Sequence, residues 1–188
     1  MRSRDRQHYE AYGNLYFITS TVVGFINIFK HKETCDIFVN CLRFYQDRGE
    51  MNILAWILMP NHFHLVIMVK DKTNISKLIG GIKRYTSRQI GNLRELDKFK
   101  RLFNKVKEAA RLESGKDVSI WKPRFDSYVI TSENVLKQKI EYIHFNPVRK
   151  NLVEYPWQWY YSSAAVYDAK PGIDLSVDTN WECLGYEE

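Results

Sequence analysis

The sequence lacks the features of a secreted, disulfide-stabilised or membrane-spanning protein. It has only three cysteines, Cys35, Cys41 and Cys183, which form no CxxC pair and leave an odd count. This pattern argues against a disulfide framework and favours a reducing compartment. The longest apolar run, 53–59, is too short to cross a bilayer. The first residues lack the apolar segment of a secretion signal, so we expect a cytoplasmic protein.

Acidic residues are also in the minority, which narrows the classes of partner. The chain has 22 Asp and Glu against 28 Lys and Arg, a formal net charge of +6. A basic balance favours anionic partners, of which nucleic acid is the usual one. No Gly-rich loop that would cradle phosphates is present, and we expect no ATP requirement. With 45% hydrophobic residues, the 188-residue chain can bury the core of one domain.

Hydrophobic periodicity predicts alternating strands and helices. The segment before the turn Pro60-Asn61 is apolar enough to be a strand covered on both faces. The predicted elements, in chain order, are a strand at 15–23, a helix at 32–48, strands at 52–59 and 62–69, a helix at 74–92, a strand at 121–130 interrupted near Pro123, and a helix that Thr131 or Ser132 caps and that ends at about Phe145, before Pro147.

This order is that of a split βαβ unit. We therefore expect residues 1–188 to form one α+β domain with a ferredoxin-like (RRM-like) antiparallel sheet and helices packed on it. Its core is expected at about 14–167, with a tail at 168–188. The lysine-rich stretch 94–118 has few large apolar residues and is expected as a solvated helix or a mobile insertion. Gly80-Gly81, inside a predicted helix, indicates either close approach of another backbone or a kink.

The first candidate for chemistry is a pair of histidines on a predicted strand. His62 and His64 stand two residues apart, so both imidazoles project from one face of the strand. They could share a metal ion, or they could be two surface histidines. The pair follows a turn and lies on an otherwise apolar strand, where burial of two imidazoles needs a reason.

The second candidate is a tyrosine on the last predicted helix. Tyr142 and Asn146 stand four residues apart and share a helix face. A tyrosine hydroxyl, with a pKa of about 10, needs help to act as a nucleophile at neutral pH. A metal ion that neutralises the attacked phosphate would provide it, and Asn146 could offer that ion a carbonyl oxygen. The sequence has twelve tyrosines, and Tyr142 could equally be a packed one.

The third candidate is a set of basic residues that could hold a nucleic-acid backbone. Basic and aromatic residues alternate in residues 121–125 (WKPRF), which could stack bases and hold phosphates or anchor a loop. The residues selected as DNA contacts are Arg84, Arg88, Lys122, Arg124 and Arg149. Further candidates, each of which could equally be ordinary solvated charge, are Arg2, Arg4, Arg6, Lys77, Lys98, Lys100, Arg101 and Lys105.

Three separated motifs resemble one family in the same order and at similar spacing. Residues 59–66 (MPNHFHLV) resemble the metal-binding strand of the HUH single-tyrosine transposases, in which U is a hydrophobic residue. Residues 121–125 and then 142–149 (YIHFNPVR) resemble the REP-associated tyrosine transposase branch of that family. Residues 157–163 resemble that branch's short Trp-Ser-Ser segment, and the resemblance covers about 16–167.

The resemblance implies a mechanism and a site. It implies that His62 and His64 are metal ligands, that Asn146 is a third, amide-type ligand, and that Tyr142 is the nucleophile on a C-terminal helix. The implied cofactor is Mg²⁺ or Mn²⁺. Mg²⁺ prefers oxygen ligands whereas Mn²⁺ suits mixed ligands, so we expect Mn²⁺ to support activity in vitro. The implied reaction cleaves and rejoins hairpin-containing single-stranded DNA through a 5′-phosphotyrosine intermediate.

The implied partner is single-stranded DNA with hairpins or palindromic repeats, and no membrane. A monomer is favoured over a homodimer, because the longer tail resembles the REP-associated branch. One alternative is a catalytically silent, domesticated nucleic-acid-binding protein of the same fold. A structural metal protein is another, but it would need four closed ligands, usually including cysteines. Here the cysteines stand far from the histidine pair.

Overall fold

The computed structural model describes residues 14–70, 73–114 and 119–180. Four strands form one sheet in the order β2-β3-β1-β4, and all neighbouring strands are antiparallel. This is the arrangement of a split βαβ unit, so the predicted antiparallel α+β sheet is confirmed. The strands are β1 (Leu15–Thr21), β2 (Met51–Met59), β3 (His62–Val69) and β4 (Asp126–Val129).

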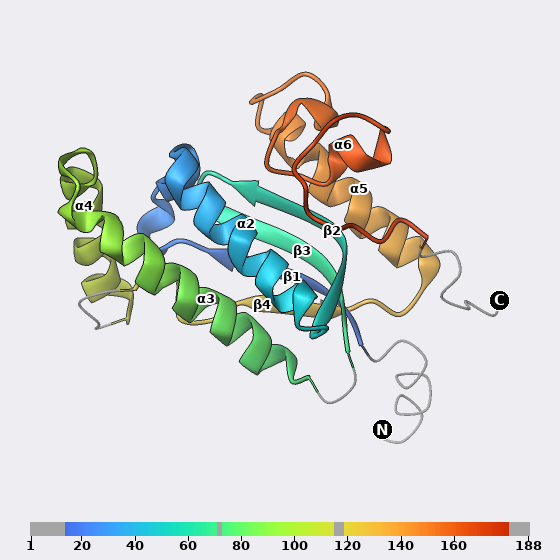
Figure 1. Cartoon of the computed structure of the whole chain (residues 1–188), viewed down its shortest axis with the longest axis horizontal. Coiled ribbons are helices and arrows are strands. Elements are labelled where there is room, and N and C mark those ends of the chain that lie inside the picture. The colour runs from blue at the N-terminus through green and yellow to red at the C-terminus, as the bar shows by residue number, and fades with distance from the viewer. Residues whose placement is uncertain (1–13, 71–72, 115–118, 181–188) are drawn as a thin grey trace.

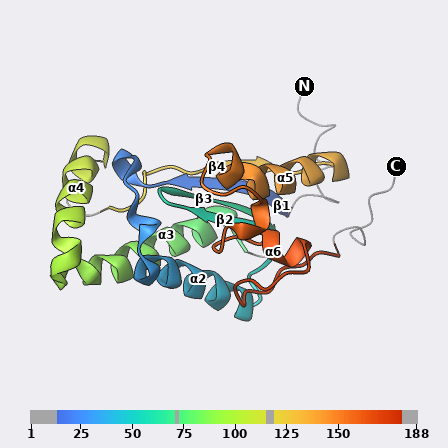
Figure 2. The ribbon, with the colours of Figure 1, turned by 90° about the horizontal axis from the view of Figure 1, so that it is seen from above.

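The helices cover both faces of the sheet (Figures 1 and 2). On one face lie α2 (Lys32–Asp47) and α3 (Ile75–Asn92), and on the other lies α5 (Glu133–Arg149). None of the helices in the described part of the chain is long and apolar enough to cross a membrane. The remaining helices are η1 (Val23–Phe25), η2 (Ile28–Lys30), η3 (Leu93–Glu95), α4 (Asp97–Ser114), η4 (Pro156–Gln158) and α6 (Ala164–Tyr167).

Strand β3 divides its side chains between two hydrophobic cores. Phe63, Leu65 and Ile67 are fully buried in the larger core with α2 and α3, and Val66 lies in the smaller core with α5. Each buried side chain of this size stabilises the fold by about 1.5–3 kcal/mol. A slip of one residue would exchange the two sets, so their burial fixes the register. The same alternation places His62 and His64 on the α5 face.

Strand β2 is at an edge of the sheet but is buried, because the chain after α5 covers that edge. Ser162 forms an antiparallel bridge with Ile57, and Leu58 N donates to Tyr161 O over 2.9 Å. The Trp159 indole donates to Leu58 O over 3.0 Å. An edge that is paired in this way does not need polar residues to prevent aggregation. The segment 157–163 therefore explains the almost continuous apolar sequence of β2.

Helix α5 continues through Pro147 to Arg149, so the prediction that Pro147 ends it is wrong. Proline removes only one backbone donor, and Pro147 is buried near the last turn, where few helical bonds remain to be broken. Lys150 N donates to Asn146 O over 3.2 Å and closes the end of the helix. Asn146 thus keeps helical geometry and stays on the same face as Tyr142.

Other element boundaries differ from the predictions at turns. The strand predicted at 15–23 ends at Thr21, and the strand predicted at 121–130 is limited to β4. Before β4, Trp121 forms only an isolated bridge with Val22, and Pro123 has no N–H to continue a ladder. At the start of α5, Ser132 is the N-cap, with its side chain accepting from the backbone of the helix.

Neither a close backbone nor a kink explains the glycine pair in α3. A Cβ on Gly81 would overlap the hydroxyl of Tyr45, whereas a Cβ on Gly80 would meet nothing within 4 Å. Gly81 therefore makes room for the side chain of Tyr45 on α2. Helix α3 (Ile75–Asn92) continues through both glycines without interruption.

The lysine-rich stretch forms α4, a helix that is docked on the rest of the domain. Phe99, Val106 and Ala110 are buried on its inner side. Its far end packs on η1, where Gly24 has a φ of 59° and its N–H donates to Glu113 Oε1 over 2.8 Å. The described part of this stretch is thus neither fully solvated nor a detached insertion, and 115–118 lie outside the described residues.

Replacing Gly24 tests this docking. An alanine there would hold its Cβ 2.8 Å from Ala109 Cβ at a positive φ, so we expect Gly24→Ala to lower the free energy of unfolding by about 1–3 kcal/mol. Gly80→Ala, in an open helical position, should be neutral or stabilise by up to about 1 kcal/mol. Urea denaturation of both variants measures the difference. Equal midpoints for Gly24→Ala and the unmodified protein would contradict the described packing.

Candidate functional site

The two histidines lie side by side at the start of β3, with ring centroids 4.9 Å apart. His62 Nδ1 is 2.7 Å from Asn61 Oδ1, and the Asn61 amide donates to Phe25 O, which orients its oxygen toward the ring. His62 Nδ1–H is therefore the donor. His64 Nδ1 lies 2.8 Å from Thr19 Oγ1. Such contacts on Nδ1 orient a metal-binding histidine and make Nε2 the nitrogen that can bind a metal ion.

Burial keeps both imidazoles neutral. Desolvation lowers the pKa of His62 to about 4, with a smaller contribution from the charge of Lys150. Desolvation also lowers the pKa of His64 to about 3, helped by the proximity of His62 and Lys139. A neutral imidazole is the form that binds a metal ion. Both rings are therefore ready to act as ligands at neutral pH without first losing a proton.

Asn146 brings α5 to the histidine pair. Its Nδ2 lies 3.1 Å from His64 Nε2, and its Oδ1 is buried without a hydrogen-bond partner among the described residues. A buried carbonyl oxygen left unpaired costs about 1–3 kcal/mol. Rotation of the amide would turn this oxygen toward His64. Two neutral imidazoles and an unpaired amide oxygen form a mixed nitrogen and oxygen donor set, which fits a divalent ion such as Mn²⁺.

These three side chains are the best candidate ligands that the structure offers. Within residues 14–70, 73–114 and 119–180, no group of three or more His, Cys, Asp or Glu side chains could hold a metal ion. The only free cysteines described, Cys35 and Cys41, are buried, and burial raises the pKa of each thiol to about 12. Neither cysteine is therefore a thiolate at neutral pH.

Tyr142 stands one turn before Asn146 on the same face of α5. Its ring centroid is 5.3 Å from that of His64 and 5.9 Å from that of Phe17. The side chain is 41% exposed, so a large substrate can reach it. Arg149 lies beside it, with its guanidinium carbon 5.4 Å from the tyrosine ring centroid. The structure thus brings Tyr142, Asn146 and both histidines together and places Arg149 at their edge, and the roles of these residues stay predictions.

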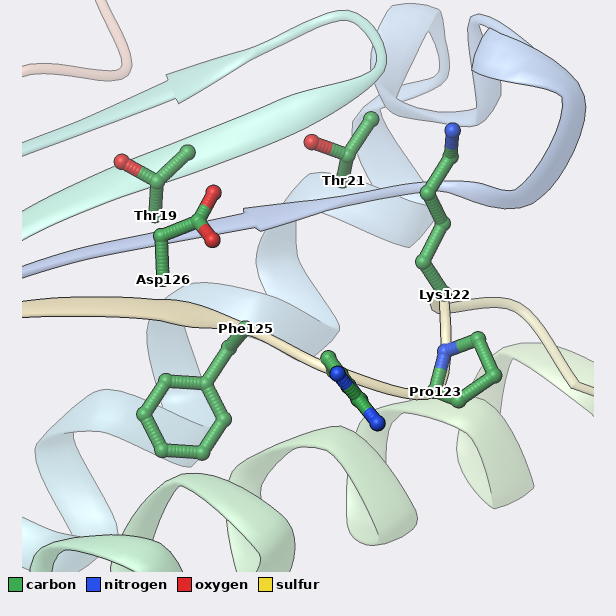
Figure 3. A pocket seen from close by; sticks show the side chains of 7 residues that line it. Thr19, Thr21, Lys122, Pro123, Phe125 and Asp126 are labelled. Atoms are coloured by element: carbon green, nitrogen blue, oxygen red, sulfur yellow. The ribbon is translucent and has the colours of Figure 1, made fainter.

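Residues 121–125, called the basic loop from here on, pass beside this face of the sheet. Lys122 and Arg124 line a hollow of about 350 Å³ together with Thr19, Thr21 and Asp126 (Figure 3). Thr19 is shared between the two features, because its hydroxyl also contacts His64. The hollow at the basic loop therefore adjoins the histidine pair through Thr19.

Lys83, a residue that the sequence reasoning missed, holds the basic loop in place from α3. Its Nζ donates to the carbonyl oxygens of Lys122, Pro123 and Arg124 over 2.7, 3.2 and 3.2 Å. Burial lowers the pKa of Lys83 to about 8, while three converging carbonyl oxygens favour its ammonium form. Helical spacing alone gives no signal for this role, because the partners are backbone atoms about forty residues away.

The other predicted DNA contacts fall in different places. Arg84 and Arg88 line a second hollow, of about 480 Å³, on the α3 side of the basic loop. Lys98 and Lys100 form ion pairs with Glu33 and Asp97. The residues that line neither hollow are Lys77, Lys98, Lys100, Arg101 and Lys105, and the positions outside the described residues are Arg2, Arg4 and Arg6.

Comparisons with known proteins identify the family to which the chain belongs. Residues 26–146 match the family described as "Transposase IS200 like", a stretch that contains all four residues of the His62, His64, Tyr142 and Asn146 cluster. A Haemophilus influenzae protein, provisionally named a REP-associated tyrosine transposase, is 30% identical over 162 residues, or 80% of each chain. The structure of a REP-associated tyrosine transposase bound to a REP hairpin has the same fold. Its TM-score is 0.54 at 19% identity, covering 89% of this chain and 87% of that one.

Fold, site and comparisons together place this protein in the class of transposases. Within that class, the chain belongs to the IS200-like transposase family and is a homologue of the REP-associated tyrosine transposases.

The role of Lys83 can be tested through the backbone that it holds. Lys83→Met leaves three carbonyl groups without their donor, so we expect the free energy of unfolding to fall by about 1–3 kcal/mol. The backbone amide hydrogens of residues 121–125 should exchange with solvent about tenfold faster or more. Lys77→Met, which removes an exposed lysine from the same helix, is the matched control. Exchange rates that are equal in the two variants would refute the anchoring role.

Proposed function

We propose that this protein cleaves and rejoins hairpin-containing single-stranded DNA, with Tyr142 as the nucleophile. The observation that carries the proposal is the convergence on one sheet face of two neutral imidazoles, an unpaired buried amide oxygen and an exposed tyrosine. Family membership supports the class of reaction. The hairpin substrate follows from the relative whose structure was determined with a REP hairpin.

His62, His64 and Asn146 would hold the divalent metal ion, through the two Nε2 atoms and Oδ1. A bound Mg²⁺ or Mn²⁺ supplies a Lewis acid that polarises a phosphate oxygen and neutralises charge in the transition state. The protein's own contribution is to keep both imidazoles unprotonated and to orient them. Burial keeps the rings neutral, and Thr19 and Asn61 orient them by contacting the Nδ1 atoms. Mn²⁺ suits this mixed donor set better than Mg²⁺.

Tyr142 would form the covalent intermediate. Its phenolic oxygen gives up its proton to solvent and attacks the phosphorus in line, and a P–O bond to the tyrosine forms. The 3′-oxygen leaves with the electron pair of the broken bond and takes up a proton from solvent. The product is a 5′-phosphotyrosine and a free 3′-hydroxyl. Because one phosphodiester replaces another, attack by a 3′-hydroxyl can reverse the step and join strands without ATP. The exposure of Tyr142 allows a DNA strand to reach it.

The basic side chains around this centre would bind the DNA backbone. Lys122 and Arg124 line the hollow next to the histidine pair, and Arg149 lies against Tyr142. Arg84 and Arg88 extend the positive surface to the α3 side of the basic loop. Phosphate contacts of this kind supply affinity without base specificity. A catalytically silent binding protein would keep these contacts but would not need the tyrosine beside the histidine pair.

Metal binding should be visible as a thermal shift. Mn²⁺ at about 100 times its dissociation constant stabilises the folded state by about 2.7 kcal/mol, which raises the Tm by about 5–10 °C for a chain of this size. We expect His64→Ala to lose most of this shift, and His31→Ala, a histidine at the start of α2, to keep it. An undiminished shift in His64→Ala would place the metal elsewhere.

The nucleophile is tested by covalent trapping. The protein is mixed with labelled single-stranded hairpin DNA and Mn²⁺, denatured, and examined for a protein–DNA adduct. We expect an adduct that a chelator abolishes and that Tyr142→Phe cannot form, because the phenyl ring has no attacking oxygen. Tyr160→Phe removes the hydroxyl of another exposed tyrosine and should leave the adduct unchanged.

The remaining outcomes separate the two functions. An adduct in Tyr142→Phe would assign the nucleophile to another tyrosine. Binding of hairpin DNA without any adduct from the unmodified protein would favour the catalytically silent, domesticated binding protein.

A further inference from the structure

The hollow beside the basic loop opens on the same sheet face as the candidate cleavage centre. Thr19 lines it, and the Thr19 hydroxyl lies 2.8 Å from His64 Nδ1. Asp126 is the cross-strand partner of Thr19 in the pairing of β1 with β4. Figure 3 shows Thr19 and Asp126 projecting to the same side, whereas Phe125 points the other way, toward α3. The hollow, of about 350 Å³, is of the size that accepts a small planar ligand.

Asp126 gives this hollow a carboxylate where the other charged lining residues are cations. Lys122 and Arg124 line the same space. The Lys122 Nζ is held between the ring of Phe25, 3.8 Å from its centroid, and Glu113, at 3.7 Å. If a DNA strand lies here, Asp126 repels each nearby phosphate and opposes the attraction of the two cations. A carboxylate in this place helps binding only if it contacts something other than phosphate.

The bases are the part of a DNA strand that offers hydrogen-bond donors to a carboxylate. An ionised aspartate only accepts hydrogen bonds. The available donors are the exocyclic amino groups of adenine, cytosine and guanine and the ring N–H groups of guanine and thymine. An unpaired base exposes all of these groups, whereas a paired base offers only the second hydrogen of an amino group, in a groove.

We propose that this hollow is a nucleobase subsite, in which Asp126 reads the Watson–Crick edge of one unpaired base next to the cleavage centre. The inference rests on the proposed function, because it requires a DNA strand at that centre. Thr19 and Thr21 add hydroxyl groups that can donate or accept, and Pro123 adds an apolar ring on which a base can lie. Lys122 and Arg124 would hold the phosphates on either side of that base.

Guanine is the base that fits a carboxylate best. Its ring N–H and its amino group are adjacent donors that match the two carboxylate oxygens with two parallel hydrogen bonds. Adenine and cytosine place an acceptor beside their single amino group, and thymine places its N–H between two carbonyl oxygens. A matched pair of hydrogen bonds of this kind discriminates between bases by about tenfold to a hundredfold.

The test is equilibrium binding of the full chain to labelled hairpins, without added metal ion, so that no strand is cut. The single-stranded flanks are varied one position at a time through all four bases. We expect a preference for guanine of about tenfold or more at one flank position. In Asp126→Asn one carboxylate oxygen, an acceptor, becomes an amide donor, so the affinity for guanine should exceed that for the other bases by no more than about threefold. Affinity for the other three bases should rise, because the variant lacks the negative charge that repels phosphate. Preferences at the other positions should not change.

Asp47→Asn is the matched control, because it removes an exposed aspartate from α2, on the opposite face of the sheet, and should keep the preference. Thermal unfolding of Asp126→Asn checks that the exposed, isosteric change leaves the fold intact.

The outcomes separate the subsite from the proposed function. A base preference that survives in Asp126→Asn, or hairpin binding with no preference at any single position, overturns the subsite and leaves the cleavage proposal standing. A preference that depends on Asp126 in a protein that forms no Tyr142 adduct supports the subsite and removes the cleavage proposal. Failure of the unmodified protein to bind any hairpin overturns both.

Discussion

The division of β3 between two cores is the constraint on which the candidate site depends. Phe63 and Leu65 are fully buried against α2 and α3, and this burial fixes which residues face the other way. His62 and His64 occupy those positions; His64 is buried and in contact with Asn146 of α5, and His62 is half-buried. Desolvation is therefore a consequence of the fold, and it is the largest cause of the low pKa of both imidazoles. The same packing that stabilises the domain keeps the two candidate ligands neutral.

Helix α5 completes the candidate site because its apolar side chains pack against the sheet and fix the position of its polar ones. Ile140 and Ile143 pack in the smaller core, which leaves Tyr142 exposed and turns Asn146 toward the histidines. The helix remains regular through Pro147, so both residues stay on one face. The unpaired oxygen of Asn146 lowers the free energy of unfolding, and the burial of the two cores offsets this loss. Unsatisfied buried polar groups of this kind concentrate at functional sites.

Short-range patterns placed the residues of the candidate site on shared faces but did not predict the contacts between distant segments. The spacing of two in His62 and His64 and of four in Tyr142 and Asn146 follows from strand and helix geometry, so these pairs could be placed on shared faces from the sequence. The prediction for Pro147 failed because a local rule of helix termination ignored the tertiary packing of that helix. Lys83 could not be found at all, since its partners are three backbone carbonyls of a loop that only the fold brings near.

The distribution of charge around the site separates affinity from selectivity. Lys83 draws the carbonyl groups of the basic loop inward, and the side chains of Lys122 and Arg124 line the hollow next to it. Cations in this position attract any nucleic-acid strand and supply little sequence information. Selectivity then requires a group that gains nothing from phosphate, and Asp126 is such a group among the residues that line the hollow. The proposed function needs both, because cations alone hold every strand equally, whereas a carboxylate that contacts a base favours particular strands.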